Sequence, residues 1–302
     1  MIFAAIDIGS NAGRLLFSNV TEVNGIPKAE KASLIRIPLR LGFDVFDNGY
    51  ISNEKADDLI NTLKAFKLLI DVYRPVSYRA CATSAMRDAK NSAILIERIK
   101  SEVGIDLQVI DGIKEAKFIT ANNDAFFNDK IPYVMFIDVG GGSTEISLLH
   151  DNKLIDSQSF NIGTIRLLNK GVELVEWERL SMWLSNYKTI YKKIHLVGSG
   201  GNINKIKKLY GSQIDEFVSF ERIAKAHKEL SKISVEERIS SLNLRPDRAD
   251  VIVPAAEIFL AIHKIIKIER IYIPKIGLAD GIIYSLYHHY VDQKVIPNLG
   301  IK

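Results

Sequence analysis

Residues 136–149 read FIDVGGGSTEISLL: an apolar run, three glycines, and a second run that alternates apolar and polar residues. The pattern predicts two strands joined by a turn that is almost all backbone. Because glycine has no Cβ, the N–H groups of such a turn can approach an oxyanion closely. Asp138 ends the first strand, and Ser143 and Thr144 follow the turn. A carboxylate beside a phosphate cradle suits Mg²⁺; the alternative is an ordinary hairpin with a solvated aspartate.

A second stretch with the same order of residues opens the chain. Residues 2–11 read IFAAIDIGSN, and Arg14 begins the apolar return strand. Asp7 has the same place in residues 2–11 as Asp138 has in residues 136–149. Two half-chain units that each carry a phosphate-type hairpin indicate an internal duplication, with the ligand held between the halves.

Composition narrows the class of protein. The chain has 302 residues, of which 47% are hydrophobic, enough for two domains with their own cores. Its net charge of +4 is spread without a block of like charge, so no nucleic-acid partner is expected. The single cysteine, Cys81, fits a reducing compartment. We see no signal peptide and no apolar run of about 20 residues, so we expect a cytoplasmic protein without a membrane partner.

Two further polar segments follow predicted strands. Thr83, Ser84 and Arg87 lie where a strand gives way to a helix, and ligands bind at such points of an α/β sheet. Arg87 is a candidate phosphate ligand, or alternatively a surface arginine paired with Asp88. Residues 198–201, GSGG, form a third glycine-rich turn, which is a less specific signal of phosphate binding than the two hairpins.

Glu115 lies in the first turn of a predicted helix that begins after Asp111. Asp111 is a predicted N-cap, but Lys114 occupies the N3 position, so no capping box forms. The helix dipole favours the ionised form of Glu115. From these residues alone, Glu115 is either a catalytic carboxylate or an acid that only supports its helix.

The periodicity also predicts the extents of other elements. Residues 1–40 are expected to form a three-strand meander. Helices are expected over these ranges: 113–127, 174–192, 251–268 and 282–291.

Six motifs in order resemble the exopolyphosphatase / guanosine pentaphosphate phosphatase family, within the acetate kinase–sugar kinase–Hsp70–actin superfamily. The set is specific, whereas the two hairpins alone would indicate only the superfamily. The motifs are DIGSN at 7–11 with Arg14, ATSAMR at 82–87, DGIKEA at 111–116, DVGGGSTE at 138–145, GSGG at 198–201 and GLADG at 277–281.

The resemblance implies an α/β fold with two ribonuclease H-like, actin-like ATPase domains. Each would have a mixed sheet flanked by helices, and the active site would lie in the interdomain cleft. The expected domains are 1–125 and 126–281, with a C-terminal helix at about 282–302 packing back on the first. The chain looks like the short, two-domain type of the family, for which a homodimer is reasonable.

The resemblance also implies a hydrolase that releases terminal phosphate from inorganic polyphosphate or from guanosine pentaphosphate, a nucleotide of the stringent response. Glu115 would be the base that activates water, Arg87 would bind phosphate oxygens, and Asp138 with Asp7 would hold Mg²⁺. The expected phosphate-binding residues are Gly9, Ser10, Asn11, Arg14, Gly140, Gly141, Gly142, Ser143, Thr144, Gly198, Ser199 and Gly200.

The sequence departs from the family's usual Ser-Gly-x-Glu-Glu-Ala helix motif at Asp111 and Lys114. The base is retained, but Lys114 leaves open a sensor that binds polyphosphate or guanosine tetra- or pentaphosphate without hydrolysis. A phosphotransferase of the same superfamily is a further alternative, although a base in this helix favours water as the acceptor. An actin-like polymer-forming ATPase fits less well, because the chain is short and shows no assembly insertions.

Overall fold

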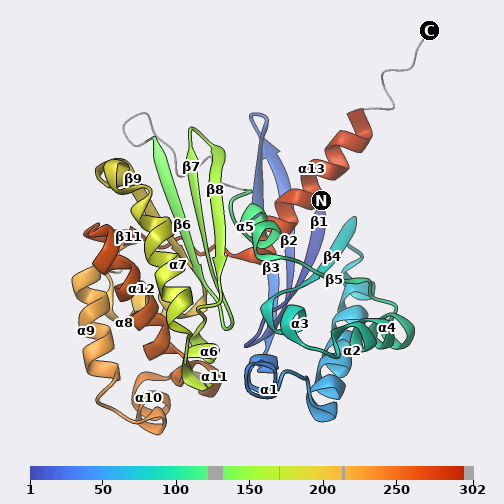
Figure 1. The fold of residues 1–302 in the computed structure, drawn as a ribbon. Coiled ribbons are helices and arrows are strands. Elements are labelled where there is room, and N and C mark those ends of the chain that lie inside the picture. Colours follow the sequence, from blue (N-terminus) through green and yellow to red (C-terminus); the bar gives the residue numbers. More distant parts are fainter. Residues whose placement is uncertain (122–131, 170, 213–214, 296–302) are drawn as a thin grey trace. The chain divides into compact units, whose positions relative to one another are not determined.

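The computed structural model describes residues 1–121, 132–169, 171–212 and 215–295. Within these residues the chain divides into two compact units (Figure 1). The first unit takes residues 1–41, the segment from Gly49 to the first gap, and the segment from Leu278. The second takes residues 42–48 and the segment from the first gap to Gly277. The boundary predicted at 125–126 lies outside the described residues.

The first unit is built on a mixed sheet with the strand order β3-β2-β1-β4-β5. The first three strands form the predicted antiparallel meander, and β4 and β5 run parallel to β1. The carboxyl ends of β1, β4 and β5 therefore lie at one edge, where α/β sheets bind ligands. The strands are β1 (Ile2–Ile8), β2 (Gly13–Val23), β3 (Ile26–Ile37), β4 (Ser77–Ala82) and β5 (Leu107–Val109).

Helices pack against this sheet. The C-terminal helix α13 contacts β1, β2 and β4 and also the short helix α5. The Ser52 hydroxyl accepts a hydrogen bond from the Lys55 N–H, as an N-cap does. The helices are α2 (Asn53–Tyr73), α3 (Ser84–Asp88), α4 (Ser92–Val103), α5 (Gly112–Ile119) and α13 (Leu278–Val295).

Two of these helices differ from the predicted extents. Helix α5 ends at Ile119 because the Thr120 hydroxyl donates to the carbonyl of Ala116, an acceptor of the last turn. The rest of the predicted extension to 127 lies mostly outside the described residues. Helix α13 starts at Leu278 rather than at 282, since Leu278 and Ala279 are buried and give its first turn packing partners.

The second unit repeats this plan with the strand order β10-β11-β9-β6-β7-β8. Strands β6 to β8 form an antiparallel meander, β9 is parallel to β6, and β11 is parallel to β9. The order β8-β7-β6-β9-β11 thus matches the whole sheet of the first unit. The strands are β6 (Tyr133–Val139), β7 (Thr144–His150), β8 (Lys153–Phe160), β9 (Ile194–Ser199), β10 (Phe217–Ser219) and β11 (Arg270–Tyr272).

The prediction of a single helix over 174–192 is wrong. The segment is divided into α7, which ends at Ser185, and a 3₁₀ helix over Lys188–Lys193. The Tyr191 hydroxyl donates to the carbonyl of Leu184, so an acceptor of the last α7 turn is satisfied without a continuing α-helix. The α-helices of this unit are α1 (Leu41–Asn48), α6 (Thr164–Asn169), α7 (Leu174–Ser185), α8 (Gly201–Tyr210), α9 (Phe220–Leu230), α10 (Val235–Leu242), α11 (Pro246–Ala249) and α12 (Ile252–Ile266).

In the part of the chain that the structure describes, no helix combines the length and the apolar character that crossing a membrane requires.

Two histidines of the second unit have lowered pKa values, so we expect the stability of this unit to fall in acid. Burial lowers the pKa of His195, with Arg270 adding to the effect, and burial lowers the pKa of His263. Both imidazoles stay neutral in the folded protein at a pH where the unfolded chain binds protons. Their stabilisation is therefore complete above about pH 6.5 and is lost as the pH falls through the lowered folded values. Urea unfolding at pH 7.5 and pH 5 should show this loss, and His195→Gln should reduce it; an equal loss in the variant would contradict the prediction.

Candidate active site

The glycine turn of the second unit is held by the helix that follows β8. The Gly140 N–H donates to the carbonyl of Ser143 at 2.9 Å and closes the turn. The N–H groups of Thr164 and Ile165, at the start of α6, donate to the carbonyls of Gly140 and Gly141 at 3.0 and 2.8 Å. These three hydrogen bonds hold the backbone of the turn in place.

Arg166 adds a side-chain support to the same turn. Its Nε donates to the carbonyl of Gly142 at 3.0 Å. The guanidinium carbon also lies 4.2 Å from the ring centroid of Phe46 on α1, in cation–π geometry. Arg166 therefore ties the turn to two helices of the unit.

Gly163 lets α6 approach the turn. A Cβ at this position would lie 2.4 Å from both the Gly141 oxygen and the Gly142 carbonyl carbon. Both are backbone atoms, which a rotamer change cannot move. Gly163 was not among the predicted site residues, and its only signal was its place between a strand and a helix N-terminus.

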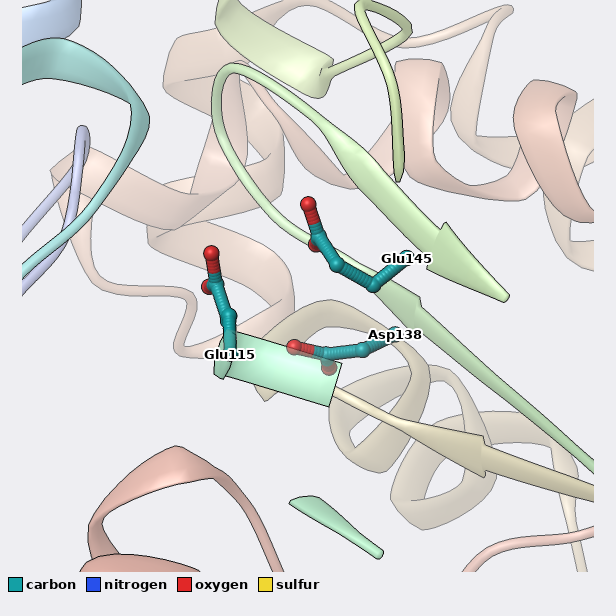
Figure 2. Close-up of side chains that lie close together, drawn as sticks. All are labelled: Glu115, Asp138 and Glu145. Atoms are coloured by element: carbon teal, nitrogen blue, oxygen red, sulfur yellow. The ribbon is translucent and has the colours of Figure 1, made fainter. Parts of the chain in front are cut away.

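Asp138 and Glu145 form a pair of carboxylates at the base of the turn. They are directly opposite across β6 and β7, and a carboxylate oxygen of one lies within 4.8 Å of one of the other. Figure 2 shows both side chains on their strands. The Ser199 hydroxyl donates to Asp138 at 2.6 Å, and the Ser159 hydroxyl donates to Glu145 at 2.8 Å. These serines fix the carboxylates in orientations that suit an oxygen-liganded cation.

Sequence reasoning did not select Glu145, although it lies in the quoted motif. The signal was available, because a short turn fixes the register of a hairpin and places Glu145 opposite Asp138. The structure gives Ser199 a role beside Asp138, whereas Gly198 faces Ile271, from which an added Cβ would be 2.8 Å away. Gly200 is the N-cap residue before α8 and has a φ of 107°.

The hairpin of the first unit is closed in the same way. The Gly9 N–H donates to the carbonyl of Ala12 at 3.1 Å. Asp7, which is buried, pairs with Arg14 at 2.8 Å across the β1–β2 register. Ser10 is buried and hydrogen-bonded to Ser84 at 2.8 Å. The hairpin is thereby joined to the start of α3, which carries Arg87. Asn11 lies in the turn between Ser10 and Ala12.

Arg87 and Glu115 come together within the first unit. Nη1 of Arg87 donates to the carbonyl of Ile110 at 3.0 Å and lies 4.0 Å from Glu115 Oε2. Its Nε lies 3.9 Å from Asp88, so the surface pairing weighed above is present as well. Glu115 is only 7% exposed. A buried carboxylate beside a guanidinium is a typical catalytic arrangement, although structural ion pairs share this geometry.

Helix α5 begins as predicted. The Asp111 carboxylate accepts from the Lys114 N–H at 2.7 Å, so aspartate caps this helix as the family's usual serine would. Lys114 itself is exposed.

Cys81 lies beside these groups on β4, opposite Asp7 in the register. Burial raises the pKa of its thiol to about 11; Arg79 opposes the shift, and the carboxylates of Asp7 and Glu115 add to it. The thiol is neutral at physiological pH and is not a nucleophile.

Two units with the same strand order and a phosphate-type hairpin each define an actin-like, two-domain fold. The model of the Ppx/GppA phosphatase family matches residues 33–290, and the chain belongs to this family.

Relatives agree with this assignment. Exopolyphosphatase 1 of Mycobacterium tuberculosis is 23% identical over 312 residues, covering 94% of this chain and 87% of the relative. The bifunctional 3-dehydroquinate synthase/phosphatase of Fusobacterium nucleatum is 33% identical over 174 residues, covering 55% of this chain but only 26% of that protein. The match therefore spans about a quarter of the bifunctional relative.

Solved structures cover nearly the whole chain. An exopolyphosphatase from Cytophaga hutchinsonii has a TM-score of 0.79 at 25% identity, covering 96% of this chain and 98% of that one. The Aquifex aeolicus member of the Ppx/GppA family has a TM-score of 0.74 at 27% identity, with the same coverage. The family resemblance, the two-domain actin-like fold and, at the level of the family, the assignment to phosphoanhydride hydrolases are confirmed.

Proposed function

We propose that the protein releases the terminal phosphate of inorganic polyphosphate, with guanosine pentaphosphate as a second candidate substrate. The observation that carries the proposal is the carboxylate pair of half-buried Asp138 and buried Glu145, at the base of a hydrogen-bonded glycine turn. Relatives named exopolyphosphatase support the choice of polyphosphate. A cytoplasmic location and a homodimer stay predictions.

In this proposal the protein acts mainly by positioning and by electrostatic stabilisation, as phosphoryl transfer requires. The turns at 9–12 and 140–143 bind the terminal phosphates through backbone N–H groups. Arg87 binds phosphate oxygens, and its guanidinium lies 4.0 Å from Glu115. Glu115 orients the attacking water and takes its proton.

Asp138 and Glu145 are the proposed ligands of Mg²⁺. Their side chains offer carboxylate oxygens within 4.8 Å of one another, as a hard cation needs. Asp7 is the other predicted ligand, but its carboxylate forms an ion pair with Arg14 at 2.8 Å. Its proposed role is therefore to orient the Arg14 guanidinium toward the phosphate. When bound, the ion would neutralise charge on the phosphate oxygens.

The test is phosphate release from short polyphosphate and from guanosine pentaphosphate. Release with Mg²⁺ is expected from at least one substrate, because the metal ligands and the base are both present. EDTA should abolish the release and added Mg²⁺ should restore it, since the phosphate charge is otherwise not neutralised. Binding without release would replace the hydrolase by a sensor, and release that persists in EDTA would contradict the metal site.

A further inference from the structure

We propose that the C-terminal helix α13 positions the catalytic helix α5, and that Gly281 is the positioning residue. The inference rests on the proposed role of Glu115 and deepens it. Gly281 belongs to the GLADG motif, to which the proposed mechanism gives no task.

The contact between the two helices is one of backbone against backbone. A Cβ on Gly281 would lie 1.7 Å from the carbonyl oxygen of Phe118 and 2.3 Å from its carbonyl carbon. Both residues belong to the first unit and both are buried. Only glycine permits α13 to come this close to α5.

Phe118 lies three residues after Glu115, one turn further along the same face of α5. A displacement of the Phe118 peptide therefore moves the turn that carries Glu115. The carbonyl of Phe118 also accepts from the Ala121 N–H at 3.0 Å at the end of the helix. The clash would fall on the hydrogen-bonded end of α5.

Helix α5 depends on such a support because it has only eight residues. Helices shorter than about 12–15 residues are marginal by themselves, so packing sets their position. Asp111 caps the N-terminal end of α5, and α13 packs against the helix. The Asp111 cap and the packing of α13 together hold the helix that carries Glu115 more firmly than either contact alone.

Arg79 makes a second connection between the same elements. Its Nη1 donates to Ser285 Oγ on α13 at 3.1 Å, and its guanidinium carbon lies 5.7 Å from the Phe118 ring centroid. The arginine itself extends from β4. Sheet, α13 and α5 thus meet at one side chain, and the removal of Ser285 Oγ would loosen the connection without a steric clash.

The test compares Gly281→Ala in two backgrounds, wild type and Glu115→Gln. Misplacing a catalytic group by about 1 Å can cost on the order of 10²-fold in rate. In the wild-type background we therefore expect Gly281→Ala to lower kcat by about 10- to 100-fold with little change in KM. In the Glu115→Gln background it should lower kcat no further, since the group that it misplaces is already disabled. Phosphate release from polyphosphate with Mg²⁺ is the readout, at raised enzyme concentration for the weak variants.

Gly277→Ala is the matched control. It adds the same methyl group four residues earlier, where no atom beyond the two neighbouring residues lies within 4 Å of the new Cβ. Its kcat should stay close to that of the wild type.

The outcomes separate the inference from the proposed function. A Gly281→Ala variant with wild-type kcat, or one that loses the same factor in both backgrounds, would overturn the positioning role. If Glu115→Gln itself matched the wild type, the proposed function would fail instead. Should Gly281→Ala not fold, Ser285→Ala takes its place, with a smaller fall in kcat that must likewise vanish in the Glu115→Gln background.

Discussion

Glu115→Gln is expected to lower kcat for phosphate release by about 10²–10⁴-fold, the usual contribution of a general base. Glutamine keeps the shape of the side chain but cannot take a proton from water. Because Glu115 is buried and lies 4.0 Å from Arg87, the variant also removes the negative charge that faces the guanidinium. Phosphate binding should therefore be kept or strengthened, and the loss should appear in kcat rather than in KM.

The measurement is the kinetics of phosphate release with Mg²⁺, combined with calorimetric binding of a non-hydrolysable polyphosphate analogue. Lys114→Gln is the control, because its side chain is the exposed neighbour of Glu115 on the same helix turn. That control should stay within a few-fold of the wild type. A Glu115→Gln variant with unchanged kcat would show that this carboxylate only supports its helix.

The fold could be predicted from the sequence to a large extent because its signals are local. Each hairpin has a glycine-rich turn between two apolar strands, and a repeat of that pattern indicates a repeat of the unit. The capping role of Asp111 follows from its place before the helix, and the structure shows the expected bond to the Lys114 N–H. The replacement of the family's serine by aspartate therefore leaves the start of α5 intact.

What the sequence did not reveal depends on contacts between distant segments. Gly163 and Gly281 each meet the backbone of an element far away in the chain, and no local pattern marks such a contact. Likewise, a helix over 174–192 satisfies the periodicity, but the hydroxyl of Tyr191 reaches back to Leu184 and replaces a helical bond. Glu145 is different, because the register of its hairpin would have placed it beside Asp138.

Gly163→Ala is expected to disturb the glycine turn of the second unit more than Gly140→Ala does. Its Cβ would meet the peptide between Gly141 and Gly142 at 2.4 Å, so either the turn or the start of α6 must move. We expect the free energy of unfolding to fall by about 1–3 kcal/mol, as overpacking usually costs. We also expect KM for polyphosphate to rise about tenfold, equivalent to roughly 1.4 kcal/mol of lost binding, because displaced N–H groups no longer converge on the phosphate.

A graded series makes this prediction specific. Gly140→Ala meets the Ser143 oxygen at 3.1 Å, a milder contact, and Gly277→Ala meets no atom beyond its two neighbouring residues within 4 Å. The order of KM should therefore be Gly163→Ala above Gly140→Ala above Gly277→Ala, measured by phosphate release and accompanied by urea unfolding of each variant. A Gly163→Ala variant that is less stable but has an unchanged KM would mean that α6 moves and the turn does not. Substrate binding would then not depend on the bonds from Thr164 and Ile165, and the turn would keep its conformation through its own closure between Gly140 and Ser143.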